Sequence, residues 1–201
     1  MVTIANGARA PDYQVSSVTS PDLTFTLKTG PLYDMIYEEM WIYYAIAPVP
    51  LTNEQITVTL NRAVVDISTV VFAIKGADTS YPFDLAAPAT TSNQYDAGLP
   101  LCMDFSAASN NVACYVETQN SNDMILGFDM GFDAINYPIA GTGYTWIGGD
   151  LGQDAHLDSA VEYTVVSTPV TGLPVDFTTS FDGSPPDAGY QLVAGLAVVG
   201  A

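Results

Sequence analysis

Apolar and polar residues alternate along several short segments of this chain. Leu23, Phe25 and Leu27 are separated by threonines, and residues 56–60 repeat the same order with Ile, Val and Leu. A period of two, carried by β-branched and aromatic residues, is typical of strands that bury one face. The pattern therefore predicts short, half-buried strands at both places.

Residues 39–46 alternate over a longer stretch and predict another strand. One face consists of Met40, Ile42, Tyr44 and Ile46, and the other of Glu39, Trp41, Tyr43 and Ala45. A helix over 31–47 is the alternative. Its faces would each mix polar and apolar residues, which favours the strand.

The rest of the chain continues as short strands separated by breakers. Further strands are predicted at 70–74, 113–118, 123–132, 143–147, 160–168, 175–181 and 190–199. Turn-forming residues lie between them, for example Asn110-Asn111, Gly141-Thr142-Gly143 and Gly148-Gly149. Many short strands of this kind indicate an antiparallel sandwich or barrel. We therefore expect one all-β domain over 1–201, an antiparallel β-sandwich.

Two segments depart from the alternation. Residues 70–74 contain no polar position, which predicts burial on both faces and places Val71, Phe72 and Ile74 in the core. Residues 77–101 are rich in proline and small residues and show little periodicity. We interpret them as a long loop excursion, and such loops tend to be functional or to form interfaces.

Composition narrows the range of functions. The 201 residues include 4 Lys and Arg against 22 Asp and Glu, a net charge of −18. Nucleic-acid binding is excluded because it needs several basic side chains, and an anionic membrane surface is disfavoured for the same reason. The first residues lack a signal-peptide pattern, and no apolar run reaches the roughly 18–20 residues of a membrane span. With 48% hydrophobic residues, the chain is expected to bury some apolar surface between subunits.

The two cysteines, Cys102 and Cys114, lie in segments that could form one hairpin. They would face each other if the turn is centred on Ala108, and would be out of register with a turn at Asn110-Asn111. Because no export signal is visible, two buried thiols are the favoured interpretation. A disulfide is the alternative.

Histidine chemistry and metal binding have few candidate residues. The single histidine, His156, lies in a polar loop, where a solvated role is expected rather than a Ser-His-Asp or Cys-His site. The same loop places Asp150, Asp154 and Asp158 at intervals of four, and clustered carboxylates can bind calcium. The spacing matches no known calcium loop, so we expect no metal requirement.

Glycan chemistry has two sets of candidate residues. A glycosidase needs two inward carboxylates, and Glu162 in the strand at 160–168 is one candidate. An ordinary outward strand residue, or a buried glutamate with a hydrogen-bond partner, is the favoured interpretation. The aromatic residues of 33–44, together with Trp146, could form a core, a protein interface or a sugar-stacking platform, with Trp41 and Trp146 as the sugar candidates.

Residues 70–84 run from an apolar strand into a corner that carries Gly76, Asp78, Pro82 and Asp84. Together with 122–127, 143–147, 161–166 and 177–179, this segment resembles small all-β structural proteins of tailed bacteriophages. The resemblance runs loosely over residues 20–200.

The resemblance implies a jelly-roll-like sandwich in the virion, either a capsid decoration protein or tail fibre or tip material. It implies a non-enzymatic protein, with no catalytic residues and no cofactor, that is assembled in the host cytoplasm. Its partners would be copies of itself, as a homotrimer, and other virion proteins such as the major capsid or tail proteins. A carbohydrate- or receptor-binding module that contacts a host-surface glycan is the alternative function.

Overall fold

The computed structural model describes residues 1–6, 13–33, 39–64, 66–84, 102–106, 112–132, 138–151, 157–178 and 190–201. These residues form strands and contain no helix, which confirms the prediction of an all-β protein. The strands are β1 (Val2–Asn6), β2 (Val15–Thr19), β3 (Thr26–Tyr33), β4 (Glu39–Tyr44), β5 (Thr57–Leu60), β6 (Ile67–Val71), β7 (Cys102–Ser106), β8 (Ala113–Val116), β9 (Asp123–Phe132), β10 (Ile139–Ala140), β11 (Thr145–Leu151), β12 (Leu157–Val166), β13 (Leu173–Thr178) and β14 (Tyr190–Val198).

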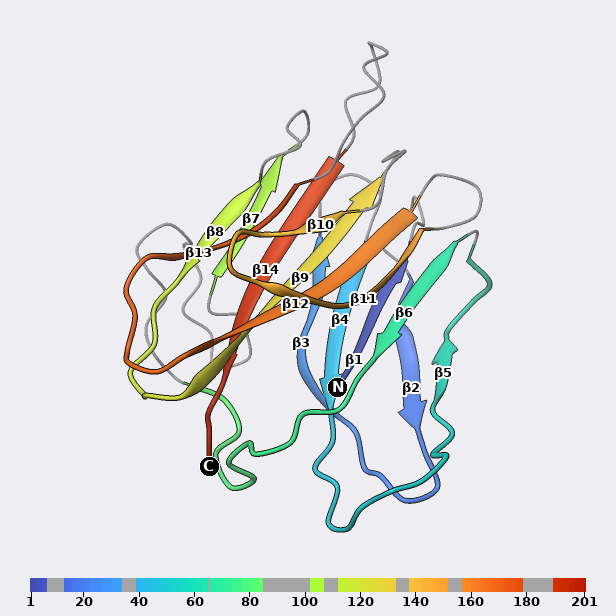
Figure 1. Ribbon diagram of the computed structural model, residues 1–201. Coiled ribbons are helices and arrows are strands. Elements are labelled where there is room, and N and C mark those ends of the chain that lie inside the picture. Colours follow the sequence, from blue (N-terminus) through green and yellow to red (C-terminus); the bar gives the residue numbers. More distant parts are fainter. Residues whose placement is uncertain are drawn as a thin grey trace.

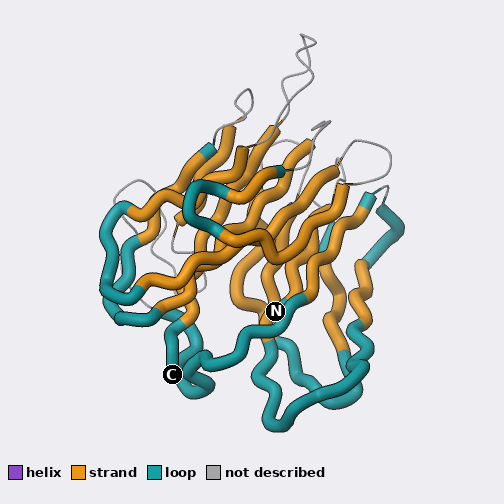
Figure 2. Tube along the Cα trace, viewed as in Figure 1, coloured by secondary structure: helices purple, strands orange, loops and turns teal. Residues whose placement is uncertain are grey.

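The described strands form four antiparallel sheets that pack as layers. The largest sheet has the order β11-β12-β9-β14-β7, and a four-stranded sheet, β3-β4-β1-β6, packs on one of its faces. A small sheet, β10-β13-β8, packs on the other face. Figure 1 shows β12, β9 and β14 side by side, and Figure 2 shows how much of the trace is strand. The sandwich is therefore confirmed, but it has more layers than the two sheets of a jelly roll, so the jelly-roll expectation is not confirmed.

Strand β9 lies in the middle of the largest sheet and is buried on both faces. Leu126, Phe128 and Met130 point toward the four-stranded sheet, and Ile125 points toward the small sheet. Successive side chains of a strand point to opposite faces, so a central layer needs apolar residues at nearly every position. The sequence of β9 meets this requirement except at Asp123 and Asp129.

The N-terminal strand β1 is also buried on both faces. Ala5 joins the core toward the largest sheet, whereas Val2 and Ile4 pack with Trp41 under the two-stranded sheet β2-β5. The alternation predicted for 39–46 is confirmed, because Met40 and Ile42 of β4 face one way and Trp41 the other. The sequence did not predict β1 or β2.

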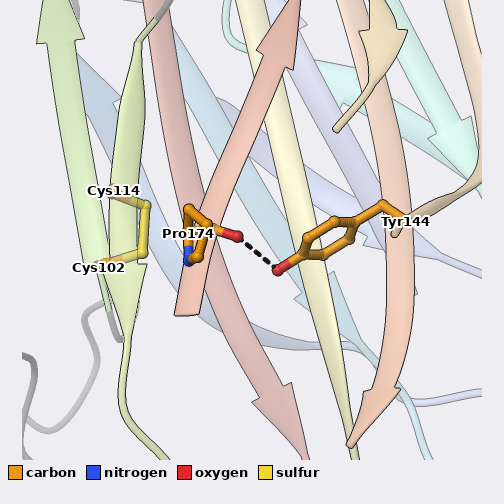
Figure 3. The surroundings of a disulfide bond; sticks show 4 residues. All are labelled: Cys102, Cys114, Tyr144 and Pro174. Carbon is orange, nitrogen blue, oxygen red and sulfur yellow. Dashed lines mark hydrogen bonds between the residues drawn. A yellow bond between two sulfur atoms is a disulfide. The ribbon is translucent and has the colours of Figure 1, made fainter. Parts of the chain in front are cut away.

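The cysteines form a disulfide, which corrects the expectation of two buried thiols. Their Cα atoms are 5.5 Å apart. They do not belong to one hairpin, because Cys102 lies in β7 of the largest sheet and Cys114 in β8 of the small sheet. Figure 3 shows the bond between these strands. It therefore joins two layers covalently.

Strand β6 corrects the prediction of a two-sided buried strand at 70–74. It lies at the edge of its sheet, and its residues alternate between buried and exposed. Val70 is buried, but Val71 has 50% of its surface exposed. Phe72 and Ile74 follow the strand and are half-buried against the main core. Val71 is therefore not a core residue.

The first part of the predicted excursion is fixed to the end of β14. Ala77 pairs with Gly200 and Phe83 with Val198. The ring of Phe83 also meets Tyr44 edge to face, with 4.9 Å between the centroids, and Lys28 Nζ lies 4.8 Å from the centre of the Phe83 ring. Residues 77–84 thus tie the largest sheet to the four-stranded sheet, while 85–101 lie outside the described residues.

Candidate functional site

Carboxyl groups are the unusual feature of the interior. Five acidic residues are buried among the described residues: Glu39, Asp84, Asp123, Asp129 and Glu162. Removing a carboxylate from water is costly unless hydrogen bonds, a cation or a proton compensate. The chain has only four Lys and Arg, so hydrogen bonds and protons are the main compensation to consider.

Glu162 lies between the largest sheet and the small sheet. It belongs to β12 and stands opposite Gly127 of β9. Its Oε2 accepts a hydrogen bond from the backbone N–H of Gly141 at 2.7 Å, whereas its Oε1 is buried without a partner. Glu162 is therefore a buried polar residue with a hydrogen-bond partner, one of the two ordinary roles that the sequence favours, although its side chain also faces inward as a glycosidase would need.

Two glycines make room for the acidic side chains here. A Cβ at Gly127 would lie 2.7 Å from Glu162 Oε1 and 2.8 Å from Val175 Cγ1. A Cβ at Gly141 would collide with the carboxylate of Asp176. Because real Cβ contacts are not this short, both positions need glycine for the acidic residues to fit.

A tight turn carries Gly141 to this position. The N–H of Tyr144 donates to the carbonyl of Gly141 at 3.0 Å, and Gly143 has a φ of 87°, which favours glycine. The Tyr144 hydroxyl then donates to the carbonyl of Pro174 at 2.9 Å, as Figure 3 shows. The turn predicted from Gly141-Thr142-Gly143 is thus connected to β12 and β13 by side-chain hydrogen bonds.

The electrostatics of this cluster favour a protonated Glu162. Burial raises the pKa of Glu162 to about 8, the N–H of Gly141 opposes the rise, and the charge of Asp176 adds to it. Burial and the same two carboxyl groups also raise the pKa of the Tyr144 hydroxyl. A neutral carboxyl can donate a proton, but Glu162 has no solvent-accessible surface. Its geometry therefore suits holding the 141–144 turn against β12 rather than contacting a substrate.

Asp129 is held by a different set of hydrogen bonds on the same face of the sheet. Its Oδ1 accepts from Gln191 Nε2 at 2.9 Å, and the same amide lies 3.3 Å from the carbonyl oxygen of Phe177. Gln191 Oε1 in turn accepts from the N–H of Val112 at 3.3 Å. These contacts connect β9, β14 and β13, so Gln191 fixes the small sheet on the largest one.

Asp84 and Asp123 form a second buried acidic pair near the end of β14. Asp84 Oδ2 accepts from the N–H of Gln119 at 2.7 Å and from the backbone and side chain of Asn120 at 3.2 and 3.1 Å. Burial raises the pKa of Asp123 to about 7, hydrogen bonding and charge repulsion from Asp84 add to it, and the N–H of Gly200 opposes it. Three N–H donors favour the charged form of Asp84. The pair is therefore best described as a carboxylate, Asp84, beside a carboxyl, Asp123, that titrates near neutral pH.

The predicted histidine and calcium residues are described only in part. His156 and Asp154 lie outside the described residues. Asp150 pairs with Ser159, and Asp158 with Leu151, at the ends of β11 and β12, so the backbone brings the two aspartates to one end of a hairpin. In the described part of the chain, no three His, Cys, Asp or Glu side chains gather as metal ligands.

The two tryptophans have different environments. Trp41 is 3% exposed and belongs to the core under β2-β5, so it offers no sugar platform. Trp146 is 39% exposed on the edge strand β11. Its ring packs over Gly149, where a Cβ would lie 2.6 Å from Cζ2. Trp146 also stands opposite Glu162 across the β11–β12 pair.

The sequence offered no signal for most of these polar contacts. Asp84 and Asp123 are 39 positions apart, and Asp129 meets Gln191 from 62 positions away. Among the five buried acids, Glu162 alone is a predicted candidate for catalysis, because it lies in a predicted strand that could turn it inward. Gly127 belongs to no recognisable motif, and Gly141 is predicted only as part of a turn.

Comparisons of this chain with protein-family models, curated proteins and solved structures gave no match. In the part of the chain that is described, no helix has the length and apolar character needed to cross a membrane.

Proposed function

We propose that this chain is a non-enzymatic structural protein of a tailed-bacteriophage particle, a capsid decoration or tail-associated accessory protein. It acts through contacts with copies of itself and with other particle proteins. The resemblance of 70–84 and the later strands to such proteins suggests the particle, and the all-β sandwich is compatible with it.

The observation that carries this proposal is the disulfide between layers. Cys102 and Cys114 join the largest sheet to the small sheet. Disulfides persist in oxidising surroundings such as virion surfaces and are rare in the cytosol. A sandwich that is covalently braced between its layers suits a particle that must survive outside the cell. The net charge of −18 also favours colloidal stability.

Self-association is the first expected property. Several large apolar side chains are exposed on strands, among them Ile67 and Val71, and burial between copies would remove such surface from water. Because 18 net negative charges repel, we expect raised salt to strengthen association. Light scattering of the purified chain at increasing salt should show a growing mass. A chain that stays a strict monomer at high concentration and high salt would contradict this.

The second candidate function is glycan binding at Trp146. The specific observation in its favour is an indole ring that is exposed on an edge strand and supported by the backbone of Gly149. Sugar rings stack on such exposed aromatic faces. A particle adhesin would combine both candidate functions.

Replacing Trp146 with Ala is expected to abolish glycan binding if this second function is present. The indole is a large part of any stacking surface there, while its partial exposure makes the loss tolerable for folding. The measurement is binding to an array of bacterial surface oligosaccharides, with Tyr81→Ala as the control because Tyr81 is also an exposed aromatic residue. Wild-type protein that binds no oligosaccharide, or equal binding by both variants, would exclude Trp146 as a platform.

A further inference from the structure

We infer that two copies of this chain pair antiparallel along β6, with Thr69 of one copy facing Thr69 of the other. This inference deepens the proposed function, because it names the surface through which the copies would associate. It rests on that function for the association itself.

The outer edge of β6 presents backbone hydrogen-bonding groups. Met1 and Phe72 exchange two hydrogen bonds, N–H of Phe72 to the carbonyl of Met1 at 3.1 Å and the Met1 amino group to the carbonyl of Phe72 at 2.6 Å. Hydrogen-bonded pairs alternate along an antiparallel ladder, and the register of β6 on β1 is unbroken. Ser68 and Val70 therefore bond to β1, while the N–H and C=O groups of 67, 69 and 71 point away from it.

The side chains at these positions are exposed as well. Ile67 is 45% and Val71 50% exposed, and Thr69 lies between them on the same face. All five residues of β6 except Ser68 are β-branched, the composition that pairs most readily in sheets. The edge is thus uncharged and well suited to accept another strand.

The other three edges of the two larger sheets are protected by features that β6 lacks. Strand β3 contains Lys28 and Pro31 and has two breaks in register. Strand β11 has a bulge between Trp146 and Gly148, and β7 carries the exposed Asp104. Proteins use such charges, prolines and bulges to prevent edge pairing. Their absence from β6 distinguishes this edge.

The sequence of β6 is complementary to itself in the proposed register. With Thr69 on the two-fold axis, Ile67 of each copy lies opposite Val71 of the other, and the two threonines lie opposite each other. Pairs of β-branched residues and of threonines stabilise neighbouring strands. A two-fold axis makes the same contact twice. For this reason we infer that the strand pairing with the outer edge of β6 is β6 of a second copy rather than an unrelated strand.

The distribution of charge along the chain also favours β6 as the contact between copies. Residues 61–76 contain Arg62 and Lys75 with Asp66 as the single acid, so this stretch has a net charge of +1 while the whole chain has −18. This stretch therefore adds little repulsion where the β6 edges of two copies approach. Two of the four basic residues of the chain flank this strand.

The test compares substitutions on β6 with matched substitutions elsewhere on the surface, using one pair of exposed valines and one pair of exposed threonines. Val71→Lys introduces a charge at the proposed contact, and Val165→Lys is its control because Val165 is 57% exposed on β12. Thr69→Cys should form a disulfide between copies under mild oxidation, because hydrogen-bonded partners lie about 5.5 Å apart. Thr57→Cys on the exposed face of β5 is the matched control.

We expect a dimer by light scattering for wild type and Val165→Lys, and a dimer weakened at least about tenfold for Val71→Lys. Covalent dimers should form with Thr69→Cys and not with Thr57→Cys. If wild type associates but Val71→Lys associates equally, if Thr69→Cys does not cross-link, or if a trimer is the sole species, the β6 contact is wrong while self-association stands. A wild type that is monomeric under all conditions would overturn both.

Discussion

Between pH 5 and pH 8, the wild-type chain should lose about 3 kcal/mol of unfolding free energy relative to Glu162→Gln. The pKa of Glu162 is raised from 4.5 to about 8 in the folded protein. The folded state therefore keeps a proton that the unfolded state has already released. A glutamine supplies a neutral side chain of the same shape that can still accept the N–H of Gly141, so its stability should lack this dependence.

The sign follows from the two pKa values. The stabilisation is complete below the unfolded pKa of about 4.3, falls as the pH rises, and is lost once the pH passes the folded pKa near 8. The limiting slope is about 1.4 kcal/mol per pH unit. We expect less than the limiting total because part of the titration lies below pH 5 and part above pH 8. The Met1 amino group, whose pKa burial lowers to about 6, acts in the opposite direction, and comparison of the two proteins cancels it.

Denaturant unfolding at each pH gives the measurement. Glu54→Gln is the control, because hydrogen bonds from Ser20 and Asp22 lower the pKa of Glu54. Glu54 therefore titrates below pH 5. Between pH 5 and pH 8, the unfolding free energy of Glu54→Gln should follow a curve parallel to that of wild type. Parallel curves for Glu162→Gln and wild type would show that Glu162 is not protonated in the folded protein.

Removing the disulfide should lower the free energy of unfolding by about as much as the Glu162 titration does. The bond closes a loop with a sequence separation of 12, and restricting the unfolded chain by such a loop is worth about 3 kcal/mol. The double variant Cys102→Ser, Cys114→Ser should therefore unfold at a clearly lower denaturant concentration. Because Cys102 and Cys114 lie in different sheets, we also expect the small sheet to separate first.

Reducing agent supplies the control for the disulfide prediction. It should lower the unfolding midpoint of wild type toward that of the serine variant and leave the variant unchanged. A wild-type midpoint that does not respond to reduction, together with free thiols in a native assay, would mean that the bond does not form in solution.

The sequence predicted strands well where the pattern is local. Residues 123–132 and 39–44 follow from alternation or continuous apolar character, and the Gly141–Gly143 turn follows from its glycines. Strand β1 was missed because its five residues are too few to give a clear periodicity. Its burial on both faces comes from layers that the sequence does not reveal.

The errors concern features that depend on the order of strands. Val71 has apolar neighbours like a core residue, but β6 lies at a sheet edge and one of its faces is exposed. The pairing of Asp84 with Asp123 depends on where the end of β14 lies. The disulfide depends on β7 and β8 meeting across two sheets, which the spacing of Cys102 and Cys114 does not reveal. Non-local contacts decide all three.

The position of β14 has a consequence for the order of events during synthesis. This strand enters between β9 and β7, both of which are translated much earlier. Until residues 190–198 have been translated, β9 can pair only with β12, and its other edge has no partner strand. The largest sheet therefore cannot close during translation of residues 1–189. Until then its apolar edge is available to chaperones or to neighbouring nascent chains, so the final step of folding is an insertion into the middle of the sheet rather than an addition at its border.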